Sequence, residues 1–304
     1  MRCTPIFSIA AFILFALAEK PLAQVSVEER LAEGQPPIVL AHRTAVFSDH
    51  PENTLAWLEA GIERGIDMLH VNPQRTADGQ YILMHDQTLN RTTDVESVYP
   101  IGAPDGPTRE QRAGQDYVGD YTLEEIRKLQ VINAADGSVH PVPTLSEAIE
   151  LVDGRALLLL GLKAYEVESL AATLEQHDTE NLQFFELYYS GTNQSKLREL
   201  AEATGVSVAV TLFRSTDYLA DLEGIYDQLG SLLWTVSTDM QRTTPEFLMR
   251  ADELGIHLII SGRRSGEDFE LVEDANTEPW QALLDMGYSV ATARPDEVLN
   301  LLGR

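Results

Sequence analysis

Two histidines and two cationic side chains stand at the ends of short apolar runs in the first half of the chain. His42 and Arg43 follow PIVLA, His85 follows YILM, and Lys163 follows LLLLGL. One imidazole of such a pair can take a proton from an attacking hydroxyl while the other gives a proton to a leaving oxygen. Arginine and lysine can hold the negative charge that grows on a phosphoryl group. The set suits cleavage of a phosphodiester, although spacing alone names no reaction.

A further run, MLHVN, carries His70 and Asn72, which an extended strand places on one face. A single histidine at a strand end is most simply explained as a residue bonded to nearby backbone. Polar residues at the ends of four successive runs favour a site instead. Glu52 lies close enough in sequence to help orient Arg43.

These residues must be positioned by short strands that alternate with helical stretches, a pattern typical of a mainly parallel sheet. Both a doubly wound sheet and a closed barrel satisfy it. Stretches of helical period such as NTLAWLEAGIERG and SKLRELAEATG end near glycine. Nine runs are predicted strands where a barrel needs eight, and LLWTVS is the weakest of them. The runs cover residues 37–43, 68–72, 81–86, 157–163, 184–189, 206–213, 232–237, 257–261 and 288–293.

The segment from about residue 94 to residue 143 interrupts this alternation. It is rich in glycine, proline and aspartate, and its one clear helix, YTLEEIRKLQ, begins with a capping box formed by Thr122 and Glu125. We interpret the segment as an insertion after the third strand. Long insertions on barrels commonly lie at the face where ligands bind.

The first residues have the pattern of an export signal. Arg2 precedes an apolar run that ends near Ala18, and Ala23 offers a small-residue cleavage point. We therefore expect a signal peptide at 1–23, a barrel domain at 24–304, and a periplasmic or secreted protein. Cys3 is the only cysteine, so cleavage would remove every thiol, and no later run approaches the length of a membrane span.

The formal net charge of −26 limits the classes of partner. An acidic surface repels phosphates at long range, which argues against nucleic acid and anionic membranes. Solubility explains most of this charge. A small phosphodiester remains a possible partner, provided that it meets a locally basic pocket. The sequence carries no signal for an oligomeric state.

Several motifs together resemble the glycerophosphodiester phosphodiesterase family. They are AHRT at 41–44, PENTLAWLEAGIERGID at 51–67, QRTADGQYILMHDQTLNRTT at 74–93 and VPTLSEAIE at 142–150, with GYSVATARPDEVLNLL near the end. The resemblance implies a (β/α)8 TIM barrel of the PLC-like phosphodiesterase type, in the α/β class. Carried over, it makes His42 and His85 the acid/base pair and Arg43 and Lys163 the phosphate contacts.

The chain departs from the family at the positions that bind metal. Where the family has Glu-x-Asp, this chain has His70-Val71-Asn72, and a family glutamate is replaced by Gly161. Thr44 replaces the glycine after His-Arg. Since Ca²⁺ and Mg²⁺ prefer several carboxylate oxygens, we expect neither ion and name no metal ligand. Asn72 with Glu186 or Asp86 would make a poor cage.

Three interpretations stay open. The imidazoles of His42, His70 and His85 could bind zinc. A protein cation, from Arg75, Arg43, Lys163 or a protonated His70, could instead replace the ion, so that Asn72 and His70 take over its contacts with substrate. Finally, the chain could be a catalytically silent barrel that binds a phosphate or a polyol. The loop at 262–266, with its two arginines, could form part of a substrate entrance.

Overall fold

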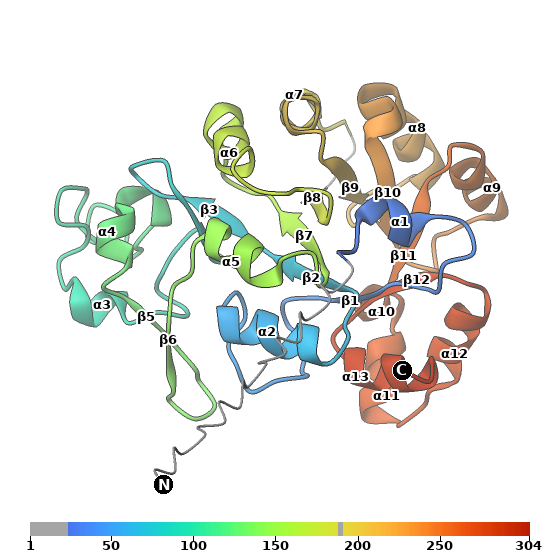
Figure 1. Ribbon diagram of the computed structural model, residues 1–304, viewed down its shortest axis with the longest axis horizontal. Helices are drawn as coiled ribbons and strands as arrows, with labels where there is room; N and C mark the ends of the chain where they lie inside the picture. The colour runs from blue at the N-terminus through green and yellow to red at the C-terminus, as the bar shows by residue number, and fades with distance from the viewer. Residues whose placement is uncertain (1–23, 188–190) are drawn as a thin grey trace, which may run out of the picture.

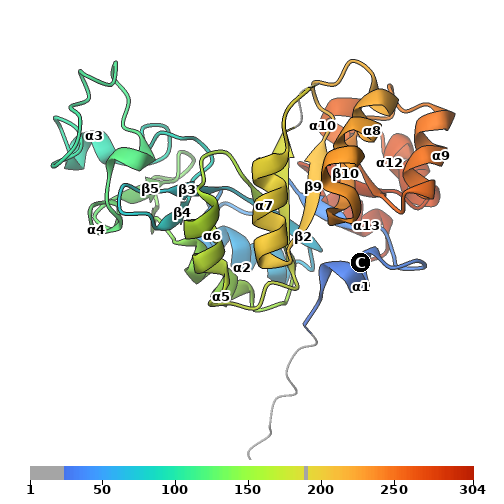
Figure 2. The ribbon, with the colours of Figure 1, turned by 90° about the horizontal axis from the view of Figure 1, so that it is seen from above.

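The computed structural model describes residues 24–187 and 191–304, which form a closed barrel of parallel strands surrounded by helices (Figures 1 and 2). Eight described strands build the barrel, and β2 pairs with β1 to close it. The predicted (β/α)8 class is therefore confirmed. In order around the barrel they are β1 (Val39–Ala41), β12 (Ser289–Thr292), β11 (His257–Ser261), β10 (Leu233–Thr238), β9 (Ser207–Thr211), β8 (Leu182–Leu187), β7 (Leu157–Gly161) and β2 (Met68–Val71).

The helices begin at residues whose side chains cap them. Thr54 accepts a hydrogen bond from the backbone of Trp57 at the start of α2, and Thr144 with Glu147 forms a capping box at the start of α5. Leucine-rich β7 is buried on both faces because these helices cover its outer side. The outer helices are α2 (Leu55–Glu63), α5 (Leu145–Val152), α6 (Val167–Leu174), α7 (Ser195–Thr204), α8 (Tyr218–Leu229), η2 (Gly230–Leu232), α9 (Pro245–Glu253), α10 (Gly262–Ser265), α11 (Glu267–Glu273), α12 (Glu278–Asp285) and α13 (Pro295–Leu301).

The run at 81–86, predicted as the third barrel strand, does not belong to the barrel. Its residues form β4 (Tyr81–Leu83), which pairs antiparallel with β3 (Pro73–Arg75). Asp78 and Gly79 lie in the turn of this hairpin. The link from β2 is too short for the crossover that a parallel neighbour needs. The weakest run, LLWTVS, is a barrel strand after all, since it supplies most of β10.

The predicted insertion lies beside the barrel and has its own small core. Its elements are α3 (Val95–Val98), η1 (Val118–Asp120), α4 (Leu123–Ile126) and the hairpin of β5 (Gln130–Ile132) and β6 (Val139–Pro141). Figure 2 shows α3 and α4 at one end of the molecule and α9 at the other. Ile82 and Leu89 pack with Tyr121 and Ile126 in this core. The capping box of Thr122 and Glu125 is present. The preceding strand is a hairpin strand, so the insertion extends the connection between the second and third barrel strands.

The amino-terminal end of the barrel is filled with apolar side chains. Ile38, Met68 and Leu157 pack there with Val27 of α1 (Val27–Leu31), which lies across this end in Figure 1. The opposite, carboxyl end is left for polar residues. None of the helices in the described ranges is long and apolar enough to cross a membrane. The predicted signal, residues 1–23, lies outside the described residues.

Candidate active site

A pocket of about 240 Å³ opens at the carboxyl ends of the barrel strands. Five of the predicted site residues line it: His42, His70, Asn72, His85 and Lys163. None of the described residues that line it is aspartate or glutamate. The rest of the wall consists of Gly161, apolar side chains (leucine, isoleucine, phenylalanine and alanine), short hydroxyl side chains from β9, β10 and β11, and Arg264. The pocket is therefore a cationic mouth above an apolar floor.

His42 follows β1 and is held by the residue that replaces the family's glycine. Its Nδ1 lies 2.9 Å from the Thr44 hydroxyl, and its backbone N–H donates to Thr292 of the neighbouring strand β12. Burial, with the charges of Arg43 and Arg263, lowers the pKa of His42 to about 4. The imidazole is consequently neutral near neutral pH.

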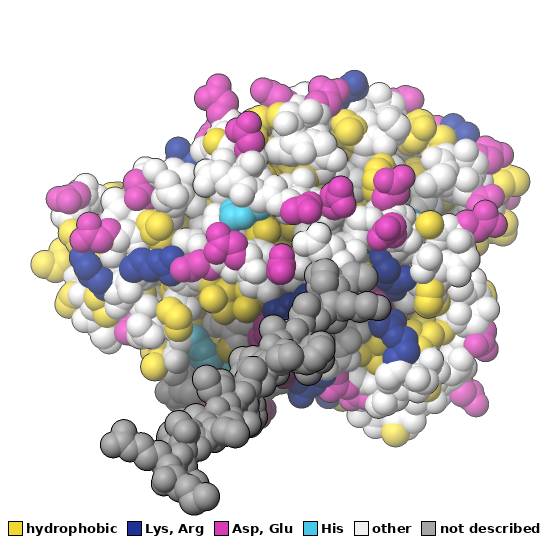
Figure 3. Space-filling model, in the orientation of Figure 1, with side chains coloured by type: hydrophobic (Ala, Val, Ile, Leu, Met, Phe, Trp, Pro, Cys, Tyr) yellow, Lys and Arg dark blue, Asp and Glu magenta, His cyan; other side chains and the backbone are white. Residues whose placement is uncertain are grey.

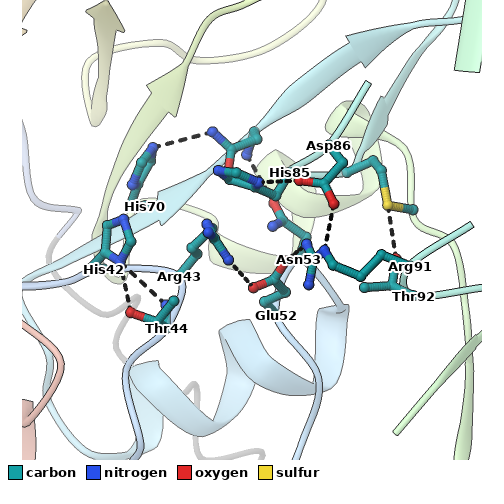
Figure 4. A network of polar contacts seen from close by, with 12 residues as sticks. His42, Arg43, Thr44, Glu52, Asn53, His70, His85, Asp86, Arg91 and Thr92 are labelled. Atoms are coloured by element: carbon teal, nitrogen blue, oxygen red, sulfur yellow. Dashed lines mark hydrogen bonds and ion pairs between the residues drawn. The ribbon is translucent and has the colours of Figure 1, made fainter. Parts of the chain in front are cut away.

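His85 stands at the end of a chain of alternating charges (Figure 4). Its Nδ1 donates to Asp86 at 2.6 Å, Arg91 bridges Asp86 to Glu52, and Glu52 accepts from Arg43 at 2.7 Å. The predicted pairing of Glu52 with Arg43 is confirmed. Neither lines the pocket, so these two side chains lie beside its wall and not in it. The chain fixes the orientation of the His85 ring.

The pKa values of the site follow from burial among cations. Burial lowers the pKa of His85, and Lys163 and Arg43 lower it further, while the hydrogen bond to Asp86 acts in the opposite direction. Burial would raise the pKa of Asp86, but hydrogen bonds from Arg91 and His85 outweigh it and lower the value to about 2. Burial and the charge of Arg43 lower the pKa of Lys163 to about 8, so this ammonium is still mostly charged at neutral pH.

His70, Asn72 and Gly161 form one packed unit at the place of the family's metal ligands. The Asn72 amide donates to His70 Nε2 at 3.3 Å and to the Gly161 carbonyl at 3.2 Å. A Cβ atom on Gly161 would overlap both side chains. His70 and Asn72 can therefore pack here only if residue 161 is glycine. A glutamate at 161 would need the space that these two side chains fill.

The donors of a divalent-cation site are not available around this unit. Both oxygens of Glu52 and both oxygens of Asp86 are engaged by arginines or by His85. Glu186 points to the other face of β8, where its carboxylate accepts from the Tyr165 hydroxyl at 2.8 Å. No three histidine, cysteine, aspartate or glutamate side chains of residues 24–187 and 191–304 could hold one ion. The residues present do not fit a Ca²⁺ or Mg²⁺ site, and they offer no zinc triad.

Two of the side chains that we considered as replacements for a metal ion, Arg75 and His70, do not place a positive charge in the pocket. Arg75 is directed away from the pocket, toward Ser169 of α6. Burial and the neighbouring His42 lower the pKa of His70 well below its usual range, so His70 is neutral.

Arg91 lies in the Arg-Thr-Thr motif at 91–93, but its role could not be predicted, because a loop residue carries no periodic signal. The sequence indicated the two arginines at 262–266 only as a possible entrance, and Arg264 does line the pocket.

Comparison with known proteins agrees with this architecture. A model of the glycerophosphoryl diester phosphodiesterase family matches residues 42–262. The chain is 32% identical over 124 residues to a glycerophosphodiester phosphodiesterase of Caldanaerobacter subterraneus subsp. tengcongensis, covering 40% of this chain and 43% of that one. It is 31% identical over 160 residues to human glycerophosphodiester phosphodiesterase domain-containing protein 5, covering 50% and 26%. The chain thus spans less than half the length of these two relatives.

Solved structures show the same fold. A glycerophosphoryl diester phosphodiesterase from Parabacteroides distasonis superposes with a TM-score of 0.68 at 20% identity, covering 92% of both chains. An Oleispira antarctica phosphodiesterase in complex with the product sn-glycerol-3-phosphate has a TM-score of 0.62 at 18% identity, covering 88% of this chain and 98% of that one. The family match extends over more than half of the chain and confirms the predicted resemblance, so the chain belongs to the glycerophosphoryl diester phosphodiesterase family.

Proposed function

We propose that this protein hydrolyses small glycerophosphodiesters by histidine acid–base catalysis. The observation that carries the proposal is the shared pocket, in which His42, His85 and Lys163 face one space that no described carboxylate lines. The relatives are named as glycerophosphodiester phosphodiesterases, and the Oleispira antarctica enzyme is described with sn-glycerol-3-phosphate as its product. These names favour hydrolysis over a silent barrel.

In this mechanism His42 acts as the base and His85 as the acid. His42 is neutral, and when its Nδ1–H is donated to Thr44 the lone pair of Nε2 is available. His42 takes the proton of the attacking hydroxyl as the new P–O bond forms. His85 gives its Nε2 proton to the leaving alcohol as the old P–O bond breaks, and Asp86 stabilises the imidazolium before this step. A water then completes hydrolysis if the attacking group is a substrate hydroxyl.

The cations stabilise the transferring phosphoryl group from two directions. Lys163 is anchored by its hydrogen bond to the His85 carbonyl, so the ammonium is placed beside the acid. Arg43 lies at the wall, and its charge lowers the pKa of His42, His85 and Lys163. The positive potential that lowers these pKa values also stabilises the dianionic transition state.

We further propose that this reaction needs no divalent cation. The support is the donor set: the packed His70, Asn72 and Gly161 fill the place of the missing ligands. The Oδ1 atom of Asn72 is buried without a hydrogen-bond partner among the described residues. Unsatisfied buried acceptors are rare, so we assign this atom to a hydroxyl of the bound glycerol moiety.

Hydrolysis of glycerophosphoinositol by the purified protein tests the proposed function. We expect release of sn-glycerol-3-phosphate, and a loss of kcat of about 10²-fold or more in His42→Ala and in His85→Ala. His177→Ala, which alters a histidine outside the pocket, is the matched control and should keep full activity. Absence of turnover in the wild-type protein, or equal activity in all three variants, would contradict the proposal.

We also propose that the protein acts outside the cytoplasm. The support is the basic start, apolar run and small-residue end of residues 1–23. Amino-terminal sequencing of protein recovered from the periplasm or medium should begin at Gln24. Recovery of uncleaved protein in the cytoplasm would contradict this expectation.

A further inference from the structure

A second hollow lies next to the candidate active site and shares part of its wall. The two share four residues, His42, Ser261, Arg264 and Ala291. The second hollow adds Arg263, so two consecutive arginines border the space beside His42. A substrate whose phosphodiester reaches His42 can therefore extend a headgroup toward both guanidinium groups.

These two arginines have no carboxylate partner within ion-pair distance in the described part of the chain, although the protein is strongly acidic. Most other described arginines do have one, such as Arg109 with Asp116 at 2.6 Å. The one carboxylate of the second hollow, Asp268, is already engaged by the Thr292 hydroxyl at 2.6 Å and by the backbone N–H of Ala293 at 2.9 Å. Neither arginine is therefore in an ion pair with a described residue, and the two positive charges outnumber the one described carboxylate that borders the hollow.

The fold positions the backbone of the two arginines and the side chain of Arg264. The guanidinium of Arg264 lies over the ring of Phe213, a contact that favours a cation and limits its motion. Gly262 begins α10 directly against the buried Trp280, where a Cβ atom would overlap the indole ring. The close approach fixes the direction in which Arg263 and Arg264 leave β11.

The wall next to the arginines is rich in hydroxyl groups. Thr211, Thr235, Ser237 and Ser261, from β9, β10 and β11, line the main pocket on this side. Short hydroxyls can donate to and accept from the hydroxyls of a polyol. With no described carboxylate in the main pocket, a quaternary ammonium headgroup would meet only neutral and positive groups.

We propose that Arg263 and Arg264 form a subsite for a second phosphate, so that the preferred substrate is a glycerophosphodiester whose polyol headgroup carries a phosphate monoester. The inference rests on the proposed function, because it takes the phosphodiester to lie at His42 and His85. Guanidinium groups bind phosphate oxygens through paired hydrogen bonds, which gives the preference a geometric basis.

Kinetics with three substrates test this subsite. They are glycerophosphoinositol with a phosphate monoester on the ring, glycerophosphoinositol itself, and glycerophosphocholine. We expect kcat/KM for the phosphorylated compound to exceed the other two by about tenfold or more, the value of one charge-assisted contact. The ratio of kcat/KM for the phosphorylated and unphosphorylated substrates should fall toward one in R263Q/R264Q and be kept only in part in R263K/R264K, which retains the charge but not the paired hydrogen bonds. The exposed Arg198→Gln removes a positive charge elsewhere and should keep the wild-type ratio.

Calorimetric titration of the same compounds into the wild-type protein and into His85→Ala separates the subsite from the reaction. Selective binding of the phosphorylated compound without turnover would support the subsite and contradict the proposed hydrolysis. Equal kcat/KM and equal affinity for the two inositol compounds would overturn the subsite, even if both are hydrolysed. Thermal unfolding of R263Q/R264Q at the wild-type temperature excludes a folding defect as the cause.

Discussion

At the scale of single residues, the absence of a side chain at Gly161 determines both the packing and the ligand chemistry of the site. The hydrogen atom of Gly161 leaves the space that His70 and Asn72 occupy, and these two side chains stand where carboxylates would bind a cation. The three positions therefore have to change together. A glutamate placed alone at 161 would collide with its neighbours instead of restoring a ligand.

We predict that Gly161→Ala destabilises the protein by about 1–3 kcal/mol, the usual cost of forcing an extra methyl into a filled site. Urea unfolding followed by circular dichroism measures this change. Ala164→Gly, a nearby substitution outside the packed unit, serves as the control. A Gly161→Ala variant as stable as the wild type would show that His70 and Asn72 can move aside.

The pH dependence of kcat/KM follows from the two histidines. His42 must be unprotonated, so activity should rise as pH increases through the pKa of about 4. His85 must be protonated, and burial lowers its pKa. Activity should therefore fall as the pH rises through a value below the usual histidine pKa. The optimum is expected to be acidic.

The Asp86→Asn variant tests which histidine acts as the acid. Asp86 raises the pKa of His85 by its hydrogen bond and its charge, so the amide should move the descending limb to lower pH. The ascending limb, which belongs to His42, should stay in place. Steady-state kcat/KM profiles of both proteins provide the measurement, and a descending limb that moves to higher pH would reverse the proposed roles.

The sequence predicted most of these residues because strand exits in a barrel lie at one end. His42, His70, Asn72 and Lys163 line one pocket, as their positions at barrel-strand ends implied, whereas His85 reaches it from the end of the hairpin strand β4. The packing of Gly161 could not be predicted, because a missing side chain signals nothing until its neighbours are placed. The bridging role of Arg91 depends on where two separate loops meet, which no local pattern encodes.

At the scale of elements, the connection after β2 determines where His85 lies. The β3–β4 hairpin extends away from the barrel and returns His85 to the pocket wall, where the Lys163 ammonium donates to its carbonyl. A run of apolar residues looks the same in a hairpin as in a buried strand. The short connection after β2 and the Asp-Gly turn between β3 and β4 are the sequence signals of a hairpin, since a parallel strand needs a longer crossover.

Arg91 joins this hairpin connection to the loop after β1. We predict that Arg91→Gln lowers kcat/KM by about ten- to a hundredfold, because His85 and Arg43 lose their common support. The unfolding temperature should change little, since exposed ion pairs contribute about 0–1 kcal/mol. Arg91→Lys should recover part of the activity. Kinetics paired with thermal unfolding test this, and unchanged kcat/KM in Arg91→Gln would contradict a positioning role.

At the scale of the whole molecule, a cationic mouth is set in a strongly acidic protein. Figure 3 shows acidic side chains spread over the displayed face instead of gathered in one patch. With a formal net charge of −26, these groups repel one another in the folded state. The negative charge lies on the surface of the protein, and the cations at the mouth of the active-site pocket are a local exception.

Salt should therefore stabilise this protein. We predict that its melting temperature rises by several degrees between low and moderate NaCl, as screening weakens the repulsion. Differential scanning calorimetry over a salt series measures the effect, with sucrose as an uncharged control for solute exclusion. A melting temperature that falls steadily with NaCl would mean that surface ion pairs outweigh the net charge.

We propose that this barrel cleaves phosphodiesters although His70, Asn72 and Gly161 occupy the position of the family's metal ligands. The most direct measurement is kcat/KM for glycerophosphoinositol after exhaustive dialysis against EDTA, and again after addition of Ca²⁺, Mg²⁺ or Zn²⁺. We predict the same value in every condition. A loss of about tenfold or more on chelation, restored by one of these cations, would contradict the account by showing that a metal supplies the transition-state charge.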